Sequence, residues 1–394
     1  MSLNTTTSSE RIHISFFGCR NAGKSSLVNA VTNQNLSVVS DIKGTTTDPV
    51  KKAMEILPIG PVVIIDTAGL DDGGKLGSLR VEKTMEVLGK TDIAILVIDS
   101  TIGMNDYDKD LIKLFEERKM PYIVVYNKSD LIKEKSEKLI YTSTVNNEGI
   151  NELRELLGKI ATENKTEKYI IRDKLNGGDI VILVIPIDES APKGRIILPQ
   201  QNILRECLDV HAVTLCVQPE ELEKTLEKVT PNLVITDSQV FSKIKDIVPE
   251  SILLTSFSIL MANYKGKLDS LVENAKTISE LKDGDIVLIS EACTHHRQCN
   301  DIGTVKFPKW ISEYTGKKIV FEFTQGGEFP HDLSKYKLII HCGGCMINEA
   351  EMTTRQQRAK KRNTPMVNYG MAIAYMNGIL ERSLEIFRGK GVKG

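Results

Sequence analysis

The chain has 394 residues, and its 51 lysines and arginines nearly balance its 52 aspartates and glutamates, for a formal net charge of −1. This length allows roughly two to four domains that each bury a core, and the balanced charge argues against nucleic acid as the main partner. No apolar run reaches the length of a membrane span, and the polar N-terminal stretch has no signal-peptide core. We therefore expect a cytoplasmic protein without a membrane partner.

The first motif follows a predicted strand at Ile12–Phe17. The next residues read G-x-x-x-x-G-K-S and lead into a helical pattern at Ser26–Val31, which is the context that a phosphate-binding loop requires. Its glycines let backbone N–H groups approach phosphate oxygens, Lys24 can reach the terminal phosphates, and Ser25 can bind Mg²⁺. The residues that we assign to the nucleotide here are Gly18, Asn21, Ala22, Gly23, Lys24, Ser25 and Ser26.

A second predicted strand, Val62–Ile65, ends in the sequence D-T-A-G. At this place Asp66 can hold Mg²⁺ through water, and the N–H of Gly69 can meet a γ-phosphate.

A third predicted strand, Tyr122–Tyr126, ends in the sequence N-K-x-D. The carboxylate of Asp130 can accept hydrogen bonds from N1–H and the exocyclic amine of guanine, whereas adenine lacks that pair of donors. We expect Ser143, within Tyr141–Thr144, to contact the base through its backbone. GTP is therefore the expected nucleotide, and its base-binding residues are Asn127, Lys128, Asp130 and Ser143.

Together these motifs resemble the translation-factor-class GTPases close to the TrmE and Era families, over roughly residues 10 to 160. Thr46 matches the magnesium ligand of their G-T-T-x-D switch, and Asn21 matches the residue that binds K⁺ in potassium-activated members. Leu70 stands where Ras-like proteins have a glutamine that orients water. The resemblance implies a potassium-stimulated GTPase that is slow on its own. The residues expected to act in catalysis are Lys24, Thr46, Asp66 and Gly69.

The middle of the chain follows a polar linker at Ala161–Lys168 and lacks any ligand cluster. Strand-like and helix-like runs alternate in it, which indicates a small α/β sheet that serves for packing or self-association. These runs are Ile180–Ile187, Arg195–Pro199, Gln200–Leu208, Val213–Val217, Pro219–Val229 and Leu233–Thr236. Cys207 and Cys216 lie in or beside apolar segments, so we expect both in the core.

In the last part of the chain, two apolar runs each lead to cysteine: Ile286–Ile289 before Cys293, and Leu338–Ile340 before Cys342 and Cys345. Because ligands bind beyond the carboxyl ends of strands in open α/β sheets, the three thiolates can converge. The remaining predicted elements are a helical stretch from Leu268, a helix at Pro308–Tyr314, a strand at Lys318–Phe323, a helix from Cys345 to Arg362 and a closing amphipathic helix at Met371–Phe387.

Three reduced thiolates indicate a metal more often than a disulfide. From the residues alone, an iron–sulfur cluster, a zinc site completed by His295, His296 or His341, and no metal all stay open. A position at a helix N-terminus is expected to lower the pKa of the thiols. The basic run Arg355–Arg362 is interpreted as a solvated helix face, and Cys299 is not assigned.

The whole pattern, C-x-H and then H-C-x-x-C behind a TrmE-like GTPase, resembles the HydF family of FeFe-hydrogenase maturation GTPases. The resemblance implies a 4Fe-4S cluster on Cys293, Cys342 and Cys345, with His295 and His341 as further candidate ligands. It also implies a homodimeric scaffold that receives a diiron precursor, made with two radical maturases, and delivers it to apo FeFe-hydrogenase. The expected α/β chain has a P-loop GTPase domain at 1–168, a dimerisation domain at 169–266 and a cluster-binding domain at 267–394.

Two other functions are weighed against this one. An enzyme whose open iron binds substrate as a Lewis acid would need an acid or base near Cys293. A ribosome-assembly GTPase with a zinc-stabilised domain is disfavoured by the neutral charge. Iron or zinc content separates the zinc protein from the other two.

Overall fold

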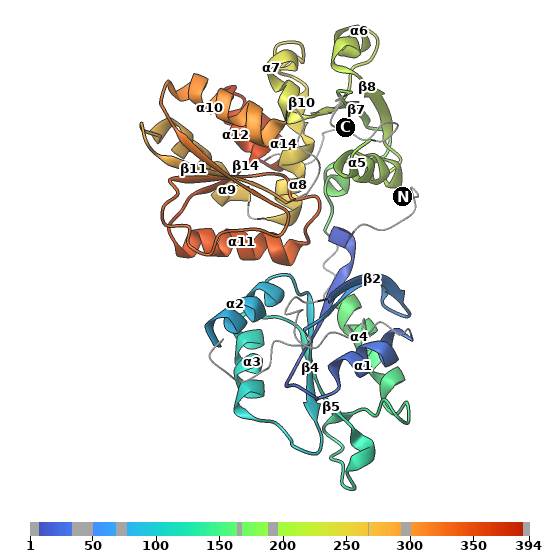
Figure 1. Ribbon diagram of the computed structural model, residues 1–394. Coiled ribbons are helices and arrows are strands. Elements are labelled where there is room, and N and C mark those ends of the chain that lie inside the picture. The colour runs from blue at the N-terminus through green and yellow to red at the C-terminus, as the bar shows by residue number, and fades with distance from the viewer. Residues whose placement is uncertain are drawn as a thin grey trace. The chain divides into compact units, whose positions relative to one another are not determined.

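The computed structural model describes residues 8–33, 50–67, 77–163, 168–187, 196–266, 268–292 and 301–388. The chain divides into two compact units, Met1–Thr166 and Glu167–Gly394. In Figure 1 the first unit runs from blue to green and the second from green to red.

The first unit is built on a six-stranded sheet with the order β2-β3-β1-β4-β5-β6, in which β2 pairs antiparallel to β3 and the other pairs are parallel. Its strands are β1 (Ile12–Phe17), β2 (Val50–Ile56), β3 (Gly60–Asp66), β4 (Ile93–Asp99), β5 (Tyr122–Asn127) and β6 (Ile140–Tyr141). Its longer helices are α1 (Lys24–Thr32), α2 (Gly77–Leu88), α3 (Asp106–Glu117) and α4 (Ile150–Glu163). The three strands predicted beside the motifs are confirmed.

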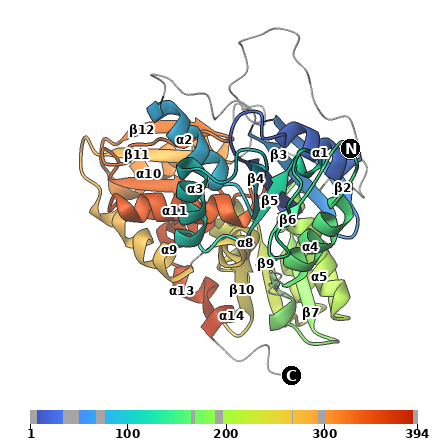
Figure 2. The same cartoon turned by 90° about the horizontal axis from the view of Figure 1, so that it is seen from below.

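Both faces of this sheet are covered, which explains why β3 and β4 contain continuous apolar runs. Alternate residues enter two separate cores: Phe16 packs with α1 and α4, and Phe17 packs with α2 and α3. In both Figure 1 and Figure 2, α2 and α3 lie on one side of the strands and α1 and α4 on the other. A ligand of this unit is therefore expected at the carboxyl ends of the strands, where open α/β sheets bind ligands.

The second unit contains two parallel four-stranded sheets, with the orders β10-β9-β7-β8 and β12-β11-β13-β14. Their strands are β7 (Ile180–Val184), β8 (Val213–Val217), β9 (Leu233–Thr236), β10 (Leu253–Ser256), β11 (Ile286–Glu291), β12 (Val320–Gln325), β13 (Leu338–His341) and β14 (Met366–Asn368). The helices are α5 (Leu198–Asp209), α6 (Leu222–Leu226), α7 (Phe241–Ile244), α8 (Phe257–Lys265), α9 (Leu268–Ala275), α10 (Phe307–Thr315), α11 (Glu349–Lys361), α12 (Tyr369–Met376), α13 (Leu380–Ser383) and α14 (Glu385–Arg388).

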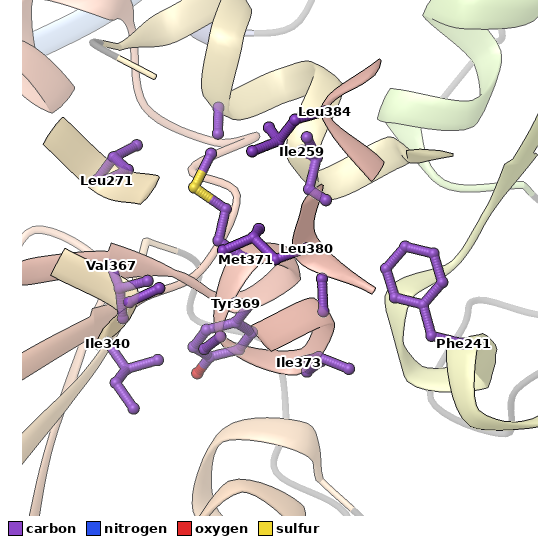
Figure 3. Packing of buried hydrophobic residues seen from close by; sticks show 14 of the residues in the cluster. Phe241, Ile259, Leu271, Ile340, Val367, Tyr369, Met371, Ile373, Leu380 and Leu384 are labelled. Atoms are coloured by element: carbon purple, nitrogen blue, oxygen red, sulfur yellow. The ribbon is translucent and has the colours of Figure 1, made fainter. Parts of the chain in front are cut away.

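The two sheets share one hydrophobic core. A single cluster contains Ile182 of β7, Ile259 of α8, Ile340 of β13 and Met371 of α12, all fully buried. Figure 3 shows Ile259, Ile340 and Met371 within this cluster. The predicted division at residues 266 and 267 therefore crosses a continuous core, and the predicted domain limits remain predictions.

For two predicted elements, the secondary structure differs from the one expected from the sequence. The closing amphipathic helix is instead three short helices, α12, α13 and α14, because Gly378, with φ of +72°, follows the end of α12 in the left-handed region. The first of them is buried over Tyr369–Ala374 and is not amphipathic. The apolar run Arg195–Pro199 contributes no strand among its described residues, since Leu198 and Pro199 begin α5.

Because the two sheets share one core, we expect a cavity at α8 to destabilise both sheets. Replacing Ile259, which is 0% exposed, by alanine should lower the free energy of unfolding by about 2–5 kcal/mol, because a cavity forms in the shared cluster. Trp310 of α10 is the single tryptophan, so its fluorescence during urea unfolding reports on the second sheet. The matched control is Ile187→Ala, at a side chain that is 76% exposed. An unchanged Trp310 midpoint in Ile259→Ala contradicts the prediction.

Candidate functional site

The phosphate-binding loop between β1 and α1 depends on two glycines. Gly18 has φ of +133°, and a Cβ there would lie 2.1 Å from the carbonyl oxygen of Val97. Gly23 has φ of +89°, and its Cβ would lie 2.2 Å from Nδ2 of Asn127. A side chain at either position would therefore force the loop away from the neighbouring strands.

Lys24 and Ser25 are held in place at the start of α1. Lys24 is 5% exposed, and its Nζ donates to the carbonyl oxygens of Gly18 at 2.7 Å and Cys19 at 2.9 Å. The Ser25 hydroxyl donates to Asp66 Oδ2 at 2.7 Å. This contact brings together the side chains predicted to hold Mg²⁺ directly and through water. The oxygens of Ser25 and Asp66 are of the kind that Mg²⁺ prefers, so the pair suits the ion.

The predicted base-binding residues gather at the end of β5. Asn127 is 1% exposed, and its Nδ2 donates to the carbonyl oxygen of Ala22 at 2.9 Å, which ties this strand to the phosphate loop. Lys128 forms an ion pair with Asp99 at 2.6 Å. Asp130 accepts a hydrogen bond from the Ser143 hydroxyl at 2.6 Å.

The expected backbone contact from Ser143 to a base stays a prediction, and the residue also has contacts within the protein. Its N–H donates to the carbonyl oxygen of Glu148 at 3.0 Å, and its hydroxyl orients Asp130. Asn21, with φ of +63°, and Ser26 are exposed at the mouth of the loop. Thr46 and Gly69 lie outside the described residues.

Sequence reasoning missed a contact between the phosphate loop and α3. Asn105 Nδ2 donates to Cys19 Sγ at 3.0 Å, and Asn105 forms a capping box with Asp108 at the start of α3. Asp108 is 1% exposed, and burial raises its pKa. The spacing Asn105-x-x-Asp108 is a capping signature that could have located this helix end, but not its contact with Cys19.

In the second unit the structure brings Cys342 to the end of β11. β11 and β13 pair in parallel, with Ser290 opposite His341. The N–H of Cys342 donates to the carbonyl oxygen of Ser290 at 3.0 Å, and the N–H of Ala292 donates to Cys342 Sγ at 3.1 Å. Ala292 directly precedes Cys293 in the chain, while Cys293 and His295 themselves lie outside the described residues.

The turn from Cys342 to Cys345 depends on Gly344. This residue has φ of +63°, and a Cβ there would lie 2.4 Å from Cε of Met352. Its N–H also donates to Cys342 Sγ at 3.4 Å. The Cys342 sulfur thus accepts two backbone N–H bonds, a setting that suits an iron–sulfur or zinc thiolate.

The predicted lowering of the thiol pKa is wrong for Cys345. Burial, followed by the nearby Cys342 thiol, raises the pKa of Cys345 to about 11, while Lys265 acts in the opposite direction. The helix cannot produce the expected effect, because α11 begins only at Glu349 and its first turn is capped by Asn348. The helix-terminus effect falls off within the first turn.

Both ring nitrogens of His341 are engaged. Nδ1 lies 2.7 Å from the carbonyl oxygen of Cys342, and Nε2 lies 3.0 Å from Nη1 of Arg355. Because a guanidinium can only donate, we assign the ring proton to Nδ1. In this arrangement His341 supports the backbone of Cys342 and has no ring nitrogen left for a metal.

The expectation of a solvated basic face is wrong at Arg355. This side chain is 2% exposed and donates to Glu351 at 2.6 Å and to the carbonyl oxygen of Gly326 at 2.8 Å. Lys360, Lys361 and Arg362 are exposed as expected. Arg355 therefore joins α11, the loop after β12 and His341.

The two cysteines expected in the core differ. Cys207 is fully buried, as predicted, and burial raises its pKa to about 11. Cys216 is exposed, because β8 is an edge strand of its sheet.

Among the residues whose placement is described, no group of three or more His, Cys, Asp or Glu side chains could hold a metal ion. The third predicted thiolate, Cys293, is not among them. Within the same ranges, the helices are too short or too polar to cross a membrane.

Comparisons with known proteins assign all three parts of the chain. Residues 13–128 match the 50S ribosome-binding GTPase family, residues 170–266 match the hydrogen maturase F dimerization domain, and residues 269–386 match the hydrogen maturase F tetramerization domain. These matches confirm the resemblance and the fold class inferred from the sequence.

Curated relatives match part of the chain. GTPase Der of Kosmotoga olearia is 38% identical over 139 residues, which are 34% of this chain and 31% of that protein. The tRNA modification GTPase MnmE of Desulforamulus reducens is 34% identical over 160 residues, 38% of this chain and 34% of that protein. The chain thus spans about a third of the length of these relatives. A crystal structure of Aquifex aeolicus Era bound to GDP and AlF₄⁻ covers 55% of this chain and 97% of its own, at 20% identity and a TM-score of 0.33.

The Der and MnmE matches cover 34% and 38% of this chain. Two adjacent family matches, to residues 170–266 and 269–386, cover most of the second unit. Both models describe domains of hydrogen maturase F, and both follow the GTPase match in the same chain. The chain therefore belongs to the hydrogen maturase F family.

Proposed function

We propose that this protein is a GTP-hydrolysing scaffold that binds a 4Fe-4S cluster and delivers a diiron precursor to apo FeFe-hydrogenase. One observation carries the cluster site: the Cys342 sulfur accepts a hydrogen bond from Ala292, the residue before Cys293. The residue that precedes Cys293 thus lies beside the Cys342 sulfur, which supports a common site for the two cysteines. Membership of the hydrogen maturase F family supports the choice of hydrogenase as the recipient.

The donor set fits an iron–sulfur cluster. Cys342, Cys345 and Cys293 would hold three irons by thiolate, and backbone N–H groups already surround the Cys342 sulfur. When bound, such a cluster supplies one iron with an exchangeable position, which suits a carrier. The chain's own contribution is to hold the turn at Gly344 and to orient Cys342 through His341.

The first unit would bind GTP and Mg²⁺. Lys24 is already aimed across the phosphate loop, Ser25 and Asp66 share a hydrogen bond at the magnesium position, and Asp130 is oriented by Ser143. Thr46 and the N–H of Gly69 would complete the γ-phosphate contacts. A loop held by the γ-phosphate and released on hydrolysis would gate encounters with partners.

Partners follow from this role. We propose two radical maturases as the source of the diiron precursor, self-association through the second unit, and no nucleic acid or membrane partner. A cytoplasmic location suits the function because thiols stay reduced there.

Metal content tests the cluster site. Protein purified without oxygen should contain about four irons per chain, and Cys293→Ala, Cys342→Ala or Cys345→Ala should each lose most of the iron and sulfide together, because a single lost ligand opens the cluster. Cys216→Ala is the matched control, since it removes an exposed thiol on an edge strand. Stoichiometric zinc instead of iron would contradict the proposal. Activation of apo-hydrogenase by the iron-loaded protein then separates a scaffold from a Lewis-acid enzyme.

Salt dependence tests the role of Asn21. Replacing K⁺ by Na⁺ should lower GTP turnover several-fold, because K⁺ held by Asn21 would supply part of the charge of an arginine finger. Such a finger contributes on the order of 10³ to 10⁵ in rate. Asn21→Ala should remove most of the difference between the two salts. The control is Asn33→Ala, because Asn33 is also exposed and left-handed, with φ of +54°, but lies at the other end of α1. Equal turnover in both salts for the unmodified protein would eliminate the assignment.

A further inference from the structure

Glu148 connects the two segments that contain the expected base-binding residues, and the motifs in the sequence did not identify it. Its carboxylate accepts a hydrogen bond from the Ser129 hydroxyl at 3.0 Å and forms an ion pair with Lys135. Its backbone pairs with Ser143 in an isolated antiparallel bridge, in which each N–H donates to the other residue's carbonyl oxygen, at 3.0 and 3.1 Å. Glu148 therefore holds one segment through its side chain and the other through its backbone.

These contacts form a closed loop of hydrogen bonds around Asp130. Ser129 directly precedes Asp130 in a short 3₁₀ helix, Ser129–Leu131. The carboxylate of Asp130 accepts from the Ser143 hydroxyl at 2.6 Å, and Glu148 joins Ser143 back to Ser129. Ser129 is 1% exposed and Ser143 is 0% exposed, so water has little access to either side chain. Both hydroxyls therefore depend on partners within the protein.

The position of Glu148 is itself set by the backbone around it. The next residue, Gly149, has φ of +70°, and a Cβ there would lie 2.0 Å from the carbonyl oxygen of Tyr141. Only glycine allows the chain to pass so close to the end of β6. The N–H of Ser129 also donates to the carbonyl oxygen of Thr142 at 3.0 Å, which ties the two segments together a second time.

The hydrogen bond to Ser129 matters more than the ion pair. The side chains of Lys135 and Glu148 are 34% and 46% exposed, so water screens the attraction between them. Lys135, followed by Ser129, lowers the pKa of Glu148. At neutral pH the carboxylate is therefore ionised and can only accept hydrogen bonds, as its contact with the buried Ser129 hydroxyl requires.

We propose that Glu148 is a positioning residue for guanine selectivity, which acts through Ser129 to hold Asp130 in place against the base. This inference rests on the GTP-binding part of the proposed function and not on the cluster. Guanine offers Asp130 two donors, N1–H and the exocyclic amine, whereas the hypoxanthine base of ITP offers N1–H alone. Displacement of the carboxylate should therefore weaken the binding of GTP more than that of ITP.

The test measures kcat and KM for GTP and for ITP, after each variant has been checked by circular dichroism. Glu148→Ala should raise KM for GTP about fivefold and KM for ITP at most about twofold, because one hydrogen bond that orients the site is lost. The value of kcat should stay unchanged, since the phosphate loop is not touched. Ser129→Ala removes the same bond from its other partner and should have the same effect.

Two further variants show which property of Glu148 is needed. Glu148→Gln keeps an oxygen that accepts from Ser129 and should restore most of the preference for GTP. Glu137→Ala is the matched control, because it removes an exposed carboxylate two residues from Lys135. Loss of selectivity in Glu137→Ala, or equal losses in Glu148→Gln and Glu148→Ala, would reject the hydrogen bond to Ser129 as the cause.

The outcomes separate this inference from the function on which it rests. If the unmodified protein does not turn over GTP, the proposed function fails and this inference with it. If it does, but Glu148→Ala keeps the original preference for GTP over ITP or loses both substrates equally, only the role of Glu148 is overturned. If Glu148→Ala does not fold, Ser129→Ala decides alone, and an unchanged preference in that variant overturns the inference.

Discussion

The candidate cluster site at Cys342 and Cys345 depends on the parallel pairing of β11 with β13. Both strands are apolar runs buried on both faces, so they pair side by side in the middle of their sheet. Their register places Ser290 opposite His341, and the next residues of each strand meet at one edge. The hydrogen bond from Ala292 to the Cys342 sulfur is the direct result.

The first unit uses the same principle. Its strands β1, β3 and β5 end at one edge of a parallel sheet, and the phosphate loop, Asp66 and Asn127 follow those ends. Two hydrogen bonds, from Ser25 to Asp66 and from Asn127 to Ala22, join the three motifs. Each unit thus has its candidate site residues at strand carboxyl ends, where open α/β sheets bind ligands.

Two buried basic side chains, Arg355 and Lys265, join elements around the cysteines. Arg355 is balanced by Glu351 and satisfied further by Gly326 and His341, as buried charges must be. Lys265 reaches the turn from α8, which also contributes Ile259 to the core shared by the two sheets. The Cys342–Cys345 turn is therefore joined to both sheets of its unit. Motion of one sheet relative to the other would displace this turn.

Much of the fold and of both sites could be predicted from the sequence, because strands buried on both faces are continuous apolar runs and because phosphate and guanine recognition need set residue types at set spacings. The strands at Ile12–Phe17 and Leu233–Thr236, the phosphate loop and the pair of cysteine motifs followed from such local patterns. The tertiary structure alone decided which polar and thiol groups are buried. Cys216 is exposed because β8 has a neighbour on one side only, Arg355 is buried because α11 packs against His341, and the pKa of Cys345 rises because its surroundings exclude water. Burial of a side chain is set by neighbours that are distant in the sequence, and no local pattern records them.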